Sequence, residues 1–251
     1  MPRVEFEELY IEVTQRCNMD CDHCLRGDGD GRDLNPEILR PLLSKTDRIR
    51  LIGFTGGEPS LVPETLEGIL SLVEEYQIPV ENFYLVTNGK VVSYAFLSAI
   101  LHWQSYCIRF AMEPELSGLA LSKDEFHEEI PPENEAKLRM FSFFTEDKMV
   151  SFLDTNRPKI LDMGRASELY ANSGYTRELV HFDPVIDVEG DTVCFREGSL
   201  LVTTDGKLLS ECNVSYDRAD EFLLCPVSEL ETYLEQARKT PCFSHGDIRA
   251  F

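Results

Sequence analysis

Three cysteines near the N-terminus, Cys17, Cys21 and Cys24, are separated by three and then by two residues. They follow the apolar segment 9–13, which predicts a strand with a short cysteine loop at its carboxyl end. Iron-sulfur clusters are held by cysteine thiolates, usually four, so a cubane bound by only three thiolates keeps one iron open to an outside ligand. The same spacing, taken alone, also suits a zinc ion or disulfide bonds. We therefore predict a metal centre that can do chemistry at its open position.

Three further segments follow predicted strands. Gly-Gly-Glu-Pro at 56–59 follows the strand expected at 50–54, Thr-Asn-Gly at 87–89 follows one at 83–86, and Gly-Arg-Ala at 164–166 follows one at 159–162. Together with the CxxxCxxC pattern of the cysteine loop, their types and order resemble the motifs of the radical S-adenosylmethionine (radical SAM) superfamily. The resemblance covers roughly the first two-thirds of the chain.

This resemblance implies two cofactors. Cys17, Cys21 and Cys24 would bind a catalytic [4Fe-4S] cluster, and the open iron would be chelated by SAM. Around SAM, the resemblance implies the following cofactor-binding residues: Gly56, Gly57, Glu58, Asn88, Glu113, Arg165 and His23.

Three of the implied SAM contacts, Glu58, Asn88 and Arg165, have a plainer alternative. Glu58 would accept hydrogen bonds from the SAM ammonium group or would be a solvated loop carboxylate, and Asn88 belongs to an Asn-Gly pair that is also a common tight turn. Arg165 would pair with the SAM carboxylate or close the barrel as a salt bridge. Glu113 stands where relatives often carry Ser or Asp near the ribose, and His23 stands where relatives often carry an aromatic residue packed near adenine.

The fold class expected from the sequence is α/β. Helices predicted around 36–43, 63–76 and 94–103 alternate with the strands, and further strands are expected at 107–112 and 140–144. Such βαβ units build parallel sheets that curl into barrels, with chemistry at the carboxyl ends of the strands. The resemblance implies a partial (β/α)6 barrel, which we assign to residues 1–180.

Residues 181–251 are expected to form a second, small domain. Asp205-Gly206 predicts a hairpin between 200–204 and 207–209, and a capping box at 228–231 predicts a helix with Leu230, Tyr233, Leu234 and Ala237 on one face. The segment resembles the SPASM/twitch extension of radical SAM enzymes that act on peptides. That resemblance implies a second, auxiliary [4Fe-4S] cluster on the remaining clustered cysteines: Cys194, Cys212, Cys225 and Cys242. Four thiolates also suit a zinc ion, and His245 is an alternative to a cysteine as the fourth ligand. The remaining cysteine, Cys107, is interpreted as a core residue.

Composition limits the partners. The 251 residues include 24 Lys plus Arg and 45 Asp plus Glu, a net charge of −21, which would repel a nucleic-acid backbone. No secretion signal and no apolar run of membrane-spanning length is evident, so we expect a cytoplasmic protein with no membrane contact. The acidity indicates solubility or the steering of a basic peptide.

The sequence as a whole predicts a radical SAM enzyme. It would cleave SAM reductively to a 5'-deoxyadenosyl radical, with electrons from an external low-potential donor, and abstract a hydrogen atom from a ribosomally made peptide. The product would be a crosslink, a thioether or an epimerised residue.

No leader-binding domain fits before Leu9, so a separate partner or the barrel itself would recognise the peptide. The alternatives are a small-metabolite enzyme or glycyl-radical enzyme activase and, in another class, a non-catalytic iron-sulfur electron carrier or a zinc-stapled binding protein.

Overall fold

The computed structural model describes residues 2–124, 126–146, 160–174, 176–181 and 183–239. The strands of its first half are β1 (Arg3–Thr14), β2 (Thr46–Gly56), β3 (Val80–Thr87), β4 (Gly118–Leu121) and β5 (Phe144–Glu146). Those of its second half are β6 (Ile160–Leu161), β7 (Thr176–Arg177), β8 (Ile186–Glu189), β9 (Thr192–Phe195), β10 (Leu200–Val202), β11 (Lys207–Leu209) and β12 (Leu223–Pro226). The α-helices are α1 (Arg40–Leu43), α2 (Pro63–Glu75), α3 (Tyr94–Cys107), α4 (Pro132–Leu138), α5 (Gly164–Tyr170) and α6 (Leu230–Lys239).

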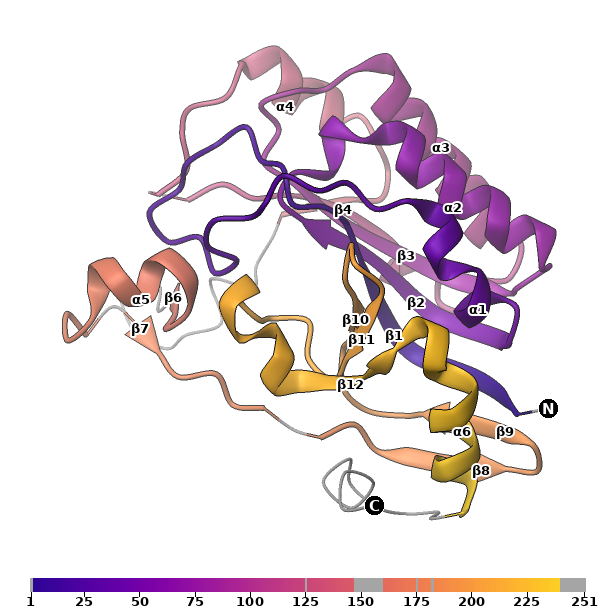
Figure 1. Cartoon of the computed structure of the whole chain (residues 1–251). Helices are drawn as coiled ribbons and strands as arrows, with labels where there is room; N and C mark the ends of the chain where they lie inside the picture. Colours follow the sequence, from indigo (N-terminus) through magenta and orange to yellow (C-terminus); the bar gives the residue numbers. More distant parts are fainter. Residues whose placement is uncertain (1, 125, 147–159, 175, 182, 240–251) are drawn as a thin grey trace.

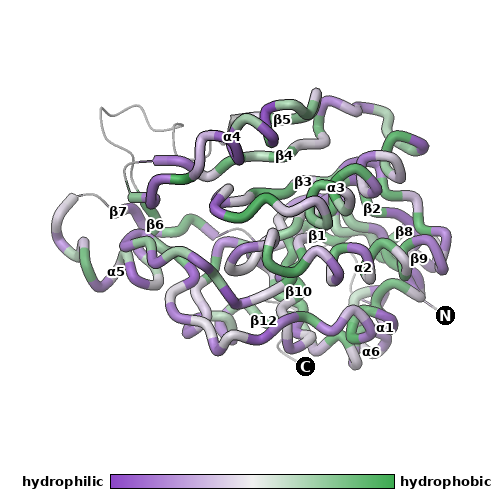
Figure 2. Tube along the Cα trace, turned by 90° about the horizontal axis from the view of Figure 1, so that it is seen from above, coloured by the Kyte–Doolittle hydropathy of each residue, from purple (hydrophilic) through white to green (hydrophobic). Residues whose placement is uncertain are grey.

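One large sheet organises the molecule. Strands β1 to β5 are parallel neighbours in chain order, so their carboxyl ends meet at one edge. Figure 1 shows α1, α2 and α3 on one side of this sheet, and the main hydrophobic core fills the space between them. The buried positions of α2 recur at helical spacing, with Leu66, Ile69 and Val73 turned to the sheet. In Figure 2 green segments of the tube gather in the centre of the fold around β1 and β3, where the buried apolar residues of these strands alternate with polar ones.

The predicted strands and helices of the first hundred residues are confirmed, but the strand expected at 107–112 is wrong. Cys107 ends α3, and Ile108 and Met112 in the following turns are 62% and 83% exposed. The reason is periodicity: Ala99, Ile100, Trp103, Tyr106 and Cys107 are buried at helical spacing, so the apolar run continues the helix. The fourth strand, β4, comes later and is short. The strand expected at 140–144 is likewise displaced, since β5 begins only at Phe144.

The C-terminal strands extend the same sheet. Strands β9 and β10 both pair with β1 in parallel, with Cys194 opposite Glu5 and Leu201 opposite Tyr10. The full order is β12-β11-β10-β1-β2-β3-β4-β5, with β8 paired to β9, while β6 and β7 form a separate two-stranded sheet. The predicted hairpin at Asp205-Gly206 is confirmed as β10–β11. We expected one domain to end at residue 180, but the sheet continues across that boundary. Strand β1 pairs with β2 on one side and with β9 and β10 on the other.

The last described helix packs as the sequence predicted. Leu230, Tyr233, Leu234 and Ala237 of α6 are all buried in the main hydrophobic core. None of the helices in the described ranges is both long and apolar enough to cross a membrane.

Candidate functional site

The cysteine loop leaves the carboxyl end of β1. Cys17 is exposed and Cys21 and Cys24 are half-buried, and all three are free thiols. The backbone turns between the last two, where the Cys24 N–H donates to the Cys21 carbonyl over 3.1 Å. Burial, together with the neighbouring thiols and Asp124, raises the pKa of Cys21 to about 12. Metal binding requires thiolates, so loading this loop with iron must release protons.

Two glycines let the next strand end touch the start of this loop. A Cβ on Gly56 would lie 2.1 Å from the Thr14 carbonyl oxygen, and one on Gly57 would lie 2.0 Å from the Arg16 carbonyl oxygen. The Gly57 and Glu58 N–H groups donate to those same two oxygens over 2.7 and 2.8 Å. Any side chain at either position would push the two segments apart. The resemblance implied that Gly56 and Gly57 contact SAM. In the structure, the backbone at these two glycines lies against the start of the cysteine loop.

Glu58 connects the ends of β2 and β3. It is 2% exposed, and its carboxylate accepts hydrogen bonds from the Ser60 N–H (2.9 Å), the Thr87 hydroxyl (2.6 Å) and the Asn88 N–H (2.8 Å). Burial raises the pKa of Glu58, although these hydrogen bonds oppose the rise. The carboxylate is therefore a buried link between two strand ends and not a solvated loop group.

Asn88 carries this connection onward to the cysteine loop. Its amide Nδ2 donates to Asn18 Oδ1 over 2.8 Å and lies 3.8 Å from the Cys17 sulfur. Lys90 adds a second contact, because its ammonium group donates to the Asn18 carbonyl over 2.8 Å. Asn88 is thus more than a turn residue, since its side chain contacts a predicted cluster ligand.

The Gly-Arg-Ala segment approaches the loop from the other side. A Cβ on Gly164, whose φ is +54°, would lie 2.5 Å from the Leu25 carbonyl oxygen and 2.6 Å from that of Cys24. The Arg165 N–H donates to the Cys24 carbonyl over 3.0 Å, and its guanidinium pairs with Asp20 and, at 3.5 Å, with Asp28. Its Nε atom is buried without a hydrogen-bond partner in the described part of the chain. All three motifs named from the sequence therefore contact the cysteine loop directly.

Glu113 does not join this group. Its carboxylate pairs over 2.9 Å with Arg50, which also faces Glu7, and it lies before β4 begins. Glu113 is therefore at the amino end of the sheet, opposite the cysteine loop. The misplaced fourth strand caused this error.

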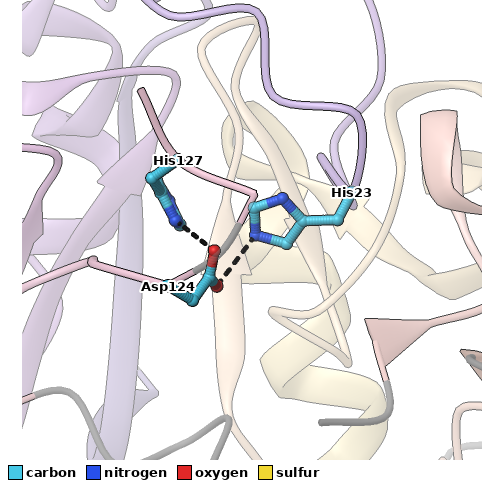
Figure 3. Close-up of side chains that lie close together, drawn as sticks. All are labelled: His23, Asp124 and His127. Carbon is cyan, nitrogen blue, oxygen red and sulfur yellow. Dashed lines mark hydrogen bonds and ion pairs between the residues drawn. The ribbon is translucent and has the colours of Figure 1, made fainter. Parts of the chain in front are cut away.

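The residues that follow the true β4 were missed by the sequence analysis. Asp124 lies between two imidazoles: its carboxylate is 2.7 Å from His127 Nδ1 and 3.4 Å from His23 Nε2 (Figure 3). The His23 ring also packs against Phe126, with 5.0 Å between ring centroids. Burial by itself raises the pKa of Asp124, but the two histidines outweigh it and hold that pKa well below its usual range. The sequence could have indicated this group only through the position of β4, because Asp124 and His127 follow the carboxyl end of that strand.

A second unpredicted contact comes from the C-terminal half. Arg26, 7% exposed, donates to the Val214 carbonyl over 2.8 Å and to the Thr55 hydroxyl over 3.2 Å. The Tyr216 N–H returns a bond of 3.0 Å to the Arg26 carbonyl. Residues 214–216 therefore hold the far end of the cysteine loop.

The three C-terminal cysteines that the structure describes, Cys194, Cys212 and Cys225, are not brought together. Cys225 is buried in the main core with Leu208, whereas Cys212 belongs to a second hydrophobic cluster with Leu201 and Leu209. Leu208 and Leu209 are consecutive in β11, so the two clusters lie on opposite faces of the sheet. Cys194 is buried near the amino end of β1, and the carboxylates that raise its pKa together with burial are Glu5, Glu189 and Asp187. Cys242 and His245 lie outside the described residues.

Comparison with known proteins finds a match in the N-terminal part. Residues 11–112 match the family model described as the Radical SAM superfamily. A stretch of 84 residues, 32% of the chain, is 30% identical to the putative peptide biosynthesis protein YydG of Bacillus subtilis (strain 168). That match spans a quarter of the relative's length.

Solved structures support the fold. A histidine-tagged anSMEcpe with bound AdoMet has a TM-score of 0.55 at 12% identity, and the match covers 94% of this chain and 82% of the other. "Native anSMEcpe with bound AdoMet and Cp18Cys peptide" has the same TM-score and identity, with 95% and 81% covered. At this identity the likeness concerns the fold alone, a mixed α/β architecture with a parallel sheet consistent with the radical SAM partial barrel.

Proposed function

We propose that this protein is a radical SAM enzyme that modifies a peptide. The observation that carries the proposal is the convergence of three motifs on one cysteine loop. The end of β1 receives a hydrogen bond from Gly57, and the loop that follows it receives hydrogen bonds from Glu58, Asn88 and Arg165.

The residues of the loop suit a [4Fe-4S] cluster with an open iron. Cys17, Cys21 and Cys24 supply three thiols, and the most exposed of them, Cys17, has the Asn88 amide beside its sulfur. When bound, the cluster and SAM supply reductive cleavage to a 5'-deoxyadenosyl radical, with electrons from an external low-potential donor. Hydrogen bonds to the sulfurs tune the potential of such a cluster, and the Asn88 amide is placed to provide one.

The other site residues act as positioning groups for SAM. Arg165 would exchange the exposed Asp20 for the SAM carboxylate, since a guanidinium binds either carboxylate in the same way. Gly56 and Gly57 keep the carboxyl ends of β1 and β2 in contact. Glu58 holds Asn88 in position by accepting a hydrogen bond from its backbone N–H. His23, whose Nε2 faces Asp124 at 3.4 Å, would present only a face of its ring to the adenine.

A peptide is the substrate class that we favour. The curated relative is described as a peptide biosynthesis protein, and one structural neighbour is described with a bound peptide. The net charge of −21 would attract a basic peptide and raise its association rate. The modification would be a crosslink, a thioether or an epimerisation.

The test is a matched pair of variants of the full chain, purified without oxygen. Changing Cys17, Cys21 and Cys24 together to Ala should remove the loop iron and abolish the release of 5'-deoxyadenosine from SAM under strong reductant. Cys107→Ala, which removes a buried thiol from α3, should leave both unchanged. Release of 5'-deoxyadenosine by the triple variant would refute the site, and absence of SAM cleavage by the iron-loaded parent would favour an electron carrier.

The iron count also tests the second cluster that the sequence suggested. Cys212 and Cys225 do not fit one cluster in the described structure, because they lie in different cores. We therefore expect about four irons per chain, all on the N-terminal loop. About eight irons would require the C-terminal strands to rearrange and would restore the auxiliary cluster.

A further inference from the structure

The strongest unassigned feature is the cluster of His23, Asp124 and His127. One ligand atom from each residue lies within 4.8 Å of one from each of the others, and it is the only such group of three or more His, Cys, Asp or Glu side chains in the described ranges. Figure 3 shows the carboxylate of Asp124 between the two imidazole rings. The side chains are 13%, 14% and 10% exposed for Asp124, His23 and His127. The cluster is thus well shielded but still open to a small solute.

The contact between Asp124 and His23 is too long for a good hydrogen bond. Asp124 Oδ2 lies 3.4 Å from His23 Nε2, and Oδ2 is buried without a hydrogen-bond partner among the described residues. Buried carboxylate oxygens are normally satisfied. Two ligands that each lie 2.0–2.1 Å from a tetrahedral ion are about 3.4 Å apart, which is the separation seen here. An ion between these atoms would satisfy both.

His127 and Asp124 have the hydrogen-bonded support that a metal site needs, whereas His23 Nδ1 is buried without a partner in the described part of the chain. His127 Nε2 is 3.0 Å from the Ser122 hydroxyl, so Nε2 can donate there while Nδ1 faces the carboxylate. Ligating histidines usually donate their second N–H to such a partner, which fixes the ring. Asp124 is itself oriented by the Phe126 N–H at 2.9 Å. An ion would replace the hydrogen bond between His127 and Asp124.

We propose that His23, Asp124 and His127 bind one divalent transition-metal ion of the zinc or ferrous class. Two imidazoles and one carboxylate suit these ions, whereas magnesium and calcium prefer oxygen ligands alone. Three protein ligands leave at least one position for water or a substrate group. The ion would also join the cysteine loop to the loop after β4, two segments about a hundred residues apart.

The first test is elemental analysis of the full chain with its cluster in place, after equilibration with zinc and removal of loosely bound metal on a chelating resin. The parent should retain one zinc more than His127→Ala, while the iron content stays the same. His102→Ala is the matched control, because His102 also faces a carboxylate, Glu67 at 2.7 Å, but has no third ligand side chain grouped with it in the described residues. Equal zinc in the parent and His127→Ala would overturn the proposal.

The second test separates this site from the thiols. Cobalt(II) is titrated into the Cys17, Cys21 and Cys24 triple Ala variant, and the absorption spectrum and circular dichroism are recorded. One equivalent should bind with visible bands but without the near-ultraviolet thiolate charge-transfer absorption, and Asp124→Asn should abolish it. Ser122→Ala should weaken binding roughly 10- to 100-fold. Binding that survives Asp124→Asn, or that carries thiolate absorption, would show that the three residues form only a hydrogen-bonded chain.

Discussion

The cysteines of the N-terminal loop and those of the C-terminal strands have contrasting surroundings. Cys17, Cys21 and Cys24 lie on irregular backbone, partly exposed, with amide and N–H donors around them. Cys212 and Cys225 are packed in two hydrophobic clusters on opposite faces of a sheet. Burial raises the pKa of both to about 12.

From this contrast we infer that cysteine spacing predicts metal ligands only where an irregular backbone allows the thiols to approach one another. A strand sends consecutive side chains to opposite faces, so cysteines on neighbouring strands meet only if their registers agree. Among the described residues, Cys212 and Cys225 pack as small hydrophobic side chains do. Three predictions test that contrast.

The largest difference is expected between two triple variants, one that removes the loop cysteines and one that removes the C-terminal cysteines. Changing Cys194, Cys212 and Cys225 together to Ala should leave the iron content and SAM cleavage at the parental level, whereas the loop triple variant loses both. The C-terminal variant should be less stable by about 1 kcal/mol for each buried thiol removed, measured by urea unfolding. If the C-terminal variant lost about half its iron, those cysteines would be ligands and the contrast would fail.

The second prediction concerns the link between the two regions. Arg26→Ala removes two hydrogen bonds from a buried guanidinium and should cost about 2–4 kcal/mol of unfolding free energy, with slower cluster reconstitution. Arg32→Ala is the control, because Arg32 lies in the same segment, is exposed and pairs only locally with Asp30. Its effect should be within about 0.5 kcal/mol. Equal costs for the two variants would show that residues 214–216 do not hold the loop.

The smallest effect is a pH dependence from Glu58. Its pKa is raised in the folded state, so between the unfolded value, 4.5, and the folded value the native protein binds more protons than the unfolded chain. Stability should therefore fall as pH rises through that interval. Unfolding free energies measured across this interval should show the decline in the parent and a shallower one in Glu58→Gln.

Glu37→Gln provides the control of opposite sign. The ion pair with Arg40 lowers the pKa of Glu37, so its contribution to stability grows as pH rises toward 4.5 and is constant above it, where that of Glu58 falls. Parallel pH profiles for the parent and Glu58→Gln would mean that the buried carboxyl keeps an ordinary pKa.

The sequence predicted the first three strands, the helices between them and the β10–β11 hairpin because each has strong local periodicity or a turn signal. It failed after Trp103, where the apolar residues to Cys107 suit either a helix or a strand, and only their packing against α2 and the sheet decides between them. It also failed to predict that β9 and β10 flank β1, because nothing local specifies which strands pair across about 190 residues.

The candidate site was predicted where residue type and position coincide with a strand end. The cysteine loop, Glu58, Asn88 and Arg165 are of this kind, and the structure places all of them together. Asp124 and His127 escaped notice because their strand was misplaced, and Glu113 was chosen for the same reason. The bonds from Val214 and Tyr216 to Arg26 depend on tertiary contacts that no spacing encodes.

The position of β1 between strands from both ends of the chain bears on how the protein is made. Domains generally fold from the N-terminus during synthesis. When residue 120 leaves the ribosome, all three loop cysteines exist, but β1 is still an unpaired edge and Gly164 has not yet closed against Cys24. The nascent chain therefore offers its cysteine loop open to iron delivery until residues 164–216 arrive, and it exposes an aggregation-prone edge for the same interval. If the loop holds the proposed cluster, a shortage of iron during translation should lower the iron content more than a shortage after the sheet is complete.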